Sequence, residues 1–116
     1  MSSRLDRISE TDLEANARQA CYQPAAFAGL CNVCLRQVQR QFTDERRITP
    51  REWLDQLRLH DAQQILARGE LVKIVALRVG FSKTSHFSRW YRRLTGVNPS
   101  ESILYNGGIE KNVVLG

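Results

Sequence analysis

The chain contains a repeat on the scale of a whole folding unit. In residues 38–52 and again in residues 87–101, an apolar residue, a polar residue, an arginine and an aromatic residue are followed by a proline eight positions after the aromatic. The two copies are offset by 49 residues, so Arg40 corresponds to Arg89 and Pro50 to Pro99. A chain of 116 residues with such a repeat is expected to form two small, similar units in tandem.

Hydrophobic spacing predicts an all-α fold. Apolar residues recur at helical intervals between glycines, and no stretch alternates apolar and polar residues for long enough to predict a strand. We expect a first helix-turn-helix subdomain over residues 9–48, a long linker helix over 49–69, a second helix-turn-helix subdomain over 70–106, and a tail over 107–116.

Capping patterns locate several helix starts. Ser9 precedes Asp12 at the spacing of an N-cap, and residues 49–52 combine a threonine cap, a proline at the first helical position and a glutamate that can reach back. Ser82 is the expected cap of the second recognition helix, and the first recognition helix is expected over about residues 34–43. The linker helix, at about 18 residues, would be about 27 Å long.

Each unit carries the turn pattern of a helix-turn-helix. Such a turn needs a small residue where its two helices cross and, four positions later, a residue that accepts a positive φ. Ala28 and Asn32 occupy these positions in the first unit, and Ala76 and Gly80 occupy them in the second. Each pattern leads into a basic helix. Two such patterns in succession therefore predict that the basic residues bind DNA, and are not simply a solvated surface.

The charge balance favours the same partner. The net charge is +5 and the isoelectric point about 9.6, and residues 71–94 hold six basic side chains and no acidic one. No apolar run approaches the length of a membrane span, and the first residues lack the charged-then-apolar layout of a signal peptide, so we expect a cytoplasmic protein without a membrane partner. Three cysteines, with both histidines far along the chain, do not make a zinc site, and we expect no cofactor, metal or catalytic centre.

Candidate contact residues follow from the geometry of the motif. The second helix of such a unit lies in the major groove, where arginine can bind guanine, glutamine can bind adenine, and serine or threonine can serve several bases. The outward residues of the first two turns, and so the candidates for base contact, are Arg36, Gln37, Gln39 and Arg40 in the first unit and Lys83, Thr84, Ser85, Ser88 and Arg89 in the second. The expected phosphate-contacting residues are Lys73, Lys83, Arg92 and Arg93, with Arg46 and Arg47 as further candidates.

The linker helix has a length suited to using both units at once. Successive major-groove faces lie about 34 Å apart, which a helix of about 27 Å plus the width of its neighbours can bridge. We therefore expect a monomer that inserts two recognition helices into successive grooves. The bound site is expected to be asymmetric, because the two helices carry different side chains.

These residues also resemble the AraC/XylS family of bacterial transcription regulators. The runs 72–82, 85–91 and 95–99 are similar to the family's C-terminal signature, and residues 48–59 are similar to the start of its linker helix. The similarity covers roughly residues 10–105. It implies seven helices and two helix-turn-helix units. By position in the family, it also implies base contacts at Arg36, Gln39 and Arg40 in the first unit and at Thr84, Ser85, Ser88 and Arg89 in the second.

Two residues of the first unit depart from the family pattern, and the lengths of the two turns agree with it. Arg47 stands where the family usually has glycine, and Cys34 stands where it usually has a capping serine. The second turn is one residue longer than the first in the family, and here Val33 to Val38 is five positions while Phe81 to Phe87 is six.

Other functions remain open at this point. The chain is either similar to small stand-alone members or is the DNA-binding piece of a longer effector-sensing regulator. A helical adaptor that recruits a protein such as RNA polymerase, with incidental DNA contact, is a second hypothesis. Cys31 and Cys34 allow a third, a thiol sensor, beside the simpler interpretation of structural thiols.

Two large side chains also have alternative roles. Arg58 in the linker helix is expected to be buried near Asp55 or Asp61 rather than bound to DNA. Trp90 lies off the expected buried face, so it either packs against the linker helix or touches the DNA backbone. An enzyme is not expected, since the sequence shows no paired carboxylates, activated nucleophile or phosphate-cradling loop.

Overall fold

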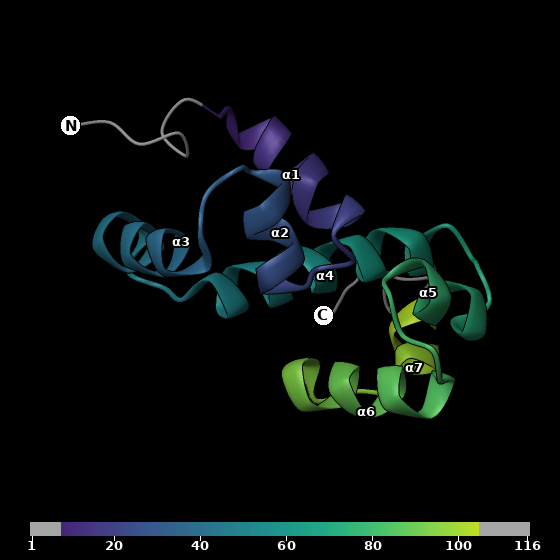
Figure 1. Cartoon of the computed structure of the whole chain (residues 1–116). Coiled ribbons are helices and arrows are strands. Elements are labelled where there is room, and N and C mark those ends of the chain that lie inside the picture. Colours follow the sequence, from purple (N-terminus) through teal and green to yellow (C-terminus); the bar gives the residue numbers. More distant parts are fainter. Residues whose placement is uncertain (1–7, 105–116) are drawn as a thin grey trace. The chain divides into compact units, whose positions relative to one another are not determined.

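The computed structural model describes residues 8–104. Within that range every regular element is helical, which confirms the all-α class (Figure 1). The elements are α1 (Glu10–Gln19), α2 (Pro24–Leu30), α3 (Leu35–Gln41), the π-helical segment η2 (Phe42–Arg46), α4 (Pro50–Ala67), α5 (Val72–Arg78), α6 (Thr84–Thr95) and α7 (Pro99–Leu104). The expected tail over 107–116 lies outside the described residues.

The chain divides into two compact units, and the boundary falls between Arg58 and Leu59, inside α4. The first unit contains α1, α2, α3, η2 and the first half of α4, and the second contains the rest of α4 with α5, α6 and α7. Among the described helices, none combines the length and the apolar character needed to cross a bilayer.

An aromatic cluster forms the core of the first unit. Phe27 of α2, Phe42 of η2 and Trp53 of α4 are all buried, and their ring centroids lie 5.4–6.2 Å apart. Val38, one turn before Phe42, is fully buried beside them, as its spacing predicted. Rings at these separations add to the hydrophobic stabilisation of the burial itself. The cluster therefore joins three separate helical segments into one core.

A second aromatic cluster forms the core of the second unit. Phe87, Trp90 and Tyr91 line the buried face of α6, and Phe81 packs on Phe87 and Trp90 with ring centroids 5.5 and 5.3 Å away. The predicted burial of Trp53 and Tyr91 is thus confirmed. Trp90 is also buried, with 7% of its surface exposed. The interpretation of Trp90 as a DNA-backbone contact is therefore wrong.

The two helix-turn-helix turns have the same backbone hydrogen bonds. In the first, the amide of Val33 donates to the carbonyl of Ala28 at 3.1 Å, and in the second the amide of Phe81 donates to that of Ala76 at 2.8 Å. Asn32 and Gly80 hold the predicted left-handed conformation, with φ values of 62° and 89°. This is a Schellman-type termination, which satisfies the last carbonyls of the first helix in each pair.

Capping interactions confirm two of the predicted helix starts. The Thr49 amide donates to the carboxylate of Glu52 at 2.9 Å, and the Glu52 amide donates to the Thr49 hydroxyl at 3.1 Å. These reciprocal bonds form a capping box at the start of α4. The Ser9 hydroxyl likewise accepts from the amide of Asp12 at 3.1 Å.

Two predicted boundaries differ from the structure. Ser82 is not the cap of the second recognition helix, because α6 begins at Thr84 with Lys83 at the N-cap position and without a side-chain capping bond. The first recognition helix also continues past its predicted end, since α3 runs directly into η2. Wider π turns are rare insertions in helices and are frequent at functional sites.

Replacing Cys34 with serine is expected to stabilise the first unit. Cys34 occupies the N-cap of α3 in an extended conformation, yet its side chain makes no capping hydrogen bond. A serine hydroxyl would accept from an unpaired amide of the first turn, which stabilises a helix by about 0.5–1 kcal/mol. Urea unfolding should show a higher midpoint with an unchanged slope. An unchanged midpoint would show that the geometry of this cap does not admit a hydroxyl bond.

Candidate nucleic-acid interface

The first recognition helix exposes the face predicted to read bases. Its buried side is marked by Val38 and, in η2, Phe42. Arg36, Gln39 and Arg40 are all exposed, and Arg36 and Arg40 are neighbours on the helix because they are four residues apart. The solvent-exposed side of α3 therefore carries the guanidinium groups of Arg36 and Arg40 and the side-chain amide of Gln39.

The second recognition helix shows a sharper division between its faces. Phe87, Trp90 and Tyr91 are buried, and the opposite side of α6, at 100° per residue, is centred on Ser85, Arg89 and Arg92. We call these three exposed residues the α6 face. Thr84 is also exposed, whereas Ser88 is half-buried. Of the predicted base-contacting residues in this unit, Ser88 is thus the least accessible.

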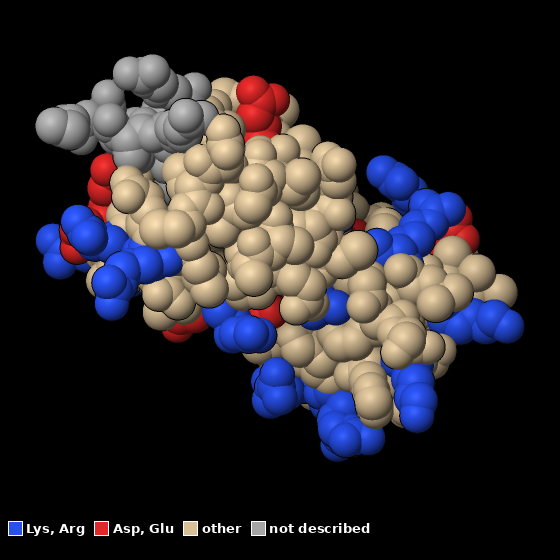
Figure 2. Space-filling view, in the orientation of Figure 1, with Lys and Arg blue, Asp and Glu red and all other residues tan. Residues whose placement is uncertain are grey.

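The predicted phosphate-contacting residues surround the α6 face. Lys83 precedes α6, Arg92 and Arg93 lie in its last turn, and Lys73 lies on α5, which packs against α6. All four are exposed, and no acidic residue occurs between positions 71 and 94. Figure 2 shows the resulting concentration of basic side chains over α6. Such a surface is suited to the closely spaced charges of a nucleic-acid backbone.

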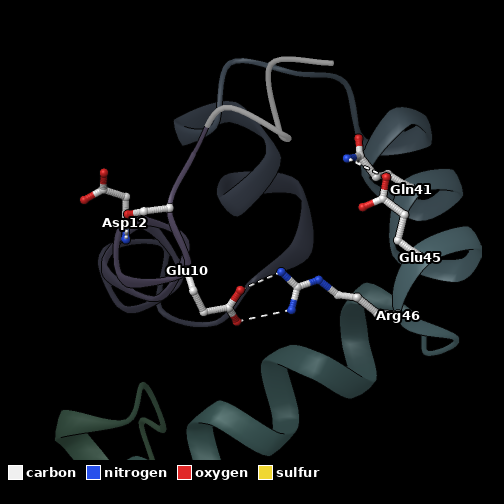
Figure 3. Close-up of polar contacts among 6 residues, drawn as sticks. Glu10, Asp12, Gln41, Glu45 and Arg46 are labelled. Carbon is white, nitrogen blue, oxygen red and sulfur yellow. Dashed lines mark hydrogen bonds and ion pairs between the residues drawn. The ribbon is translucent and has the colours of Figure 1, made fainter. Parts of the chain in front are cut away.

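Arg46 does not belong to the exposed basic set. Its guanidinium donates to both carboxylate oxygens of Glu10, at 2.6 and 3.2 Å, and joins the end of η2 to the start of α1 (Figure 3). The same group lies over the ring of Phe42 at 4.9 Å and over that of Trp53 at 5.6 Å. The hydrogen bond from Arg46 lowers the pKa of Glu10. The interpretation of Arg46 as a phosphate contact is therefore replaced by a structural one.

Substituting Glu10 with glutamine is expected to remove part of the acid dependence of stability. Because the folded-state pKa of Glu10 lies below 4.5, the Glu10–Arg46 pair stabilises the fold above that pH, and this stabilisation is lost as the pH falls through the folded-state pKa. The pair is partly exposed, so we expect a loss of about 0.5–1 kcal/mol at pH 7.

Urea midpoints between pH 7 and pH 3 measure this effect. The wild type and E10Q should differ at neutral pH and converge in acid. E14Q on the same helix is a suitable control, because Glu14 lies 3.8 Å from Arg18, whereas Glu10 lies 2.6 Å from Arg46. An equal difference at every pH would contradict the assignment to the ionised Glu10.

Arg58 is buried within the fold, as predicted. Only 9% of its surface is exposed, and its guanidinium lies 5.6 Å from the ring centre of Tyr22. Burial lowers the pKa of Arg58, and the charge of Asp55 opposes that shift. A side chain in this position supports the packing of α4 and is not presented to DNA.

The cysteines show no assembled redox or metal site in the described range. Cys21, Cys31 and Cys34 are free thiols, and no group of three metal-ligating side chains is found among residues 8–104. Cys31 is buried, and its sulfur accepts a hydrogen bond from the Asn16 amide at 3.6 Å. Burial raises the pKa of Cys31 and so reduces its thiolate content, which disfavours it as a reactive thiol.

Comparison with known proteins adds an independent line of evidence. A family model described as a helix-turn-helix domain matches residues 27–103. The chain is 40% identical over 74 residues to the HTH-type transcriptional regulator RipA of Corynebacterium diphtheriae, covering 64% of this chain and 22% of that protein. It is 35% identical over 77 residues to the HTH-type transcriptional activator RhaS of Escherichia coli, covering 66% of this chain and 28% of that protein.

A solved structure matches over most of both chains. This chain aligns to a transcriptional regulator with an AraC-type DNA-binding domain from Chromobacterium violaceum with a TM-score of 0.68 and 27% identity. The alignment covers 84% of this chain and 87% of that one. By contrast, the chain spans only about a quarter of the length of the RipA and RhaS proteins.

Proposed function

Since this chain belongs to the AraC-type family of helix-turn-helix transcription regulators, we propose that it binds double-stranded DNA in a sequence-specific way and regulates transcription. One observation carries the proposal. Two turns with matching hydrogen bonds each lead into a helix that buries an apolar side and exposes an arginine-bearing polar side. A helix of this kind is what a major groove admits.

The proposed mode of binding uses both units of one chain. In it, α3 enters one major groove with Arg36, Gln39 and Arg40, and α6 enters the next with Thr84, Ser85, Ser88 and Arg89. The single unbroken helix α4 contributes residues to both units, and its 18 residues correspond to about 27 Å. This length supports a site with two motifs one helical turn apart, bound by a monomer.

Phosphate contacts would fix the position of the protein on the duplex. Lys73, Lys83, Arg92 and Arg93 are assigned this role because they are exposed around the α6 face. With DNA as the partner, the proposed location is the bacterial cytoplasm. RNA polymerase is the proposed second partner, a role supported by the name of the RhaS relative as a transcriptional activator.

Selection from randomised duplex DNA tests the proposed function. Purified chain should enrich an asymmetric site with two motifs one helical turn apart, and its affinity for that site should fall steeply with salt because counterions are released. A single short motif would contradict the use of two units. Weak binding without sequence preference would instead support an adaptor that acts through a protein partner.

A further inference from the structure

Arg47 holds a backbone conformation that is unfavourable for its side chain. It follows η2 with φ of 61° and ψ of 24°, which is the left-handed helical region. Every residue except glycine meets a steric penalty there, because Cβ approaches the following carbonyl oxygen. Glycine, which has no Cβ, would adopt this conformation freely. The arginine is therefore not explained by the needs of the turn.

Within residues 8–104, the fold gives the Arg47 side chain no compensating contact. Its side chain is exposed and has no hydrogen-bond or ion-pair partner within residues 8–104. Its neighbour Arg46 is the opposite case, since that guanidinium is bound by Glu10 and lies over two aromatic rings (Figure 3). The Glu10–Arg46 pair joins the end of η2 to α1, and the guanidinium of the next residue, Arg47, is exposed.

Arg47 also lies within reach of the surface assigned to DNA. It comes seven residues after Arg40 and directly follows the uninterrupted helical run of α3 and η2. At about 1.5 Å per residue this separation is about 10 Å along the helix. Arg47 thus follows the base-reading residues of α3 at the C-terminal end of the same helical run, where a long cationic side chain can extend to a phosphate beside the groove.

We propose that Arg47 binds a backbone phosphate at the edge of the groove occupied by α3, and that the chain keeps a strained arginine there for this contact. The proposal rests on the proposed DNA-binding function. Guanidinium is well matched to a phosphate, and such contacts strengthen binding without selecting a sequence. Residues held in strained backbone conformations cluster at functional sites. Stability and DNA affinity are thus expected to move in opposite directions when this residue is changed.

The test compares three variants of the full chain. R47G removes both the charge and the backbone strain, and R47K keeps the charge. R18Q is the control for net charge: it removes the same single charge as R47G, but from α1, where Arg18 is exposed beside Glu14. Thermal unfolding is measured for each variant. Affinity is measured across salt concentrations on the best duplex from the selection and on a random-sequence duplex of equal length.

R47G should melt about 4 °C higher than the wild type and bind both duplexes about 3- to 10-fold more weakly. Its slope of log affinity against log salt should be shallower by about 0.9, the value for one phosphate contact. R47K and R18Q should keep the wild-type slope. An R47G variant with unchanged affinity and slope on both duplexes would overturn the proposal. A wild-type chain that binds neither duplex would instead overturn the proposed function.

Discussion

Truncating Phe27 to alanine is expected to unfold the first unit while the second stays folded. Phe27 is fully buried, and its ring packs against those of Phe42 and Trp53 with centroids 6.2 and 5.5 Å away. Removing such a side chain leaves a cavity and lowers the free energy of unfolding by about 3–5 kcal/mol. That loss is comparable to the whole stability of a small domain.

The two tryptophans make this result directly visible. Trp53 lies in the first core and Trp90 in the second, and the chain has no other tryptophan. In a proton–nitrogen NMR spectrum of F27A, the indole signal of Trp53 should move to its unfolded position while that of Trp90 stays dispersed.

A substitution of Leu30, in the same helix as Phe27, provides the matched control for F27A. Leu30 is 41% exposed, so L30A should change stability by no more than about 0.5 kcal/mol. Loss of both indole signals together in F27A would show that the two cores unfold as one cooperative unit.

Truncating Arg89 to alanine is expected to reduce sequence discrimination more than general DNA affinity. Arg89 lies at the centre of the α6 face, where an exposed guanidinium can make paired hydrogen bonds to a guanine. Losing such a contact costs about 1–3 kcal/mol, which corresponds to about 5- to 150-fold in affinity for the selected site. The preference at one base position of the second motif should relax at the same time.

R92A separates base reading from charge loss. Arg92 also lies on the α6 face, but we assign it to phosphate, so its removal should weaken the selected and the random duplex alike and reduce the salt slope. The affinities of R89A and R92A for the selected and the random duplex distinguish a base-reading role from a phosphate contact. An equal loss on the two duplexes for R89A would remove Arg89 from the base-contacting set.

Much of the local structure could be predicted from short-range patterns. The capping box of Thr49 and Glu52 and the left-handed positions of Asn32 and Gly80 depend on residues only three or four positions apart, and all were confirmed. Burial of Val38 and Phe42 followed from helical spacing in the same way. These features are fixed by backbone geometry and one neighbouring side chain.

Contacts between distant segments could not be predicted in this way. The Glu10–Arg46 pair joins residues 36 positions apart, and no spacing rule separates Arg46 from the exposed Arg47 beside it. Trp90 was misplaced because helical spacing alone did not show that Phe81, from the preceding turn, covers it. Ser82 failed as a cap because the longer second turn puts Lys83 at that position. The contact roles of the recognition-helix residues stay predictions.

The one-residue difference between the two turns bears on how specificity could be transplanted. The left-handed residue precedes the N-cap by two positions in the first unit, Asn32 to Cys34, and by three in the second, Gly80 to Lys83. A side-chain set moved from α6 to α3 by counting from the turn would therefore be out of phase by one residue, or 100° around the helix axis. The arginine of position 89 would then fall on position 41, which is half-buried, and would leave the exposed side of α3. A hybrid regulator must instead be aligned on the buried residues, Val38 with Phe87, so that each grafted side chain keeps its angle to the groove.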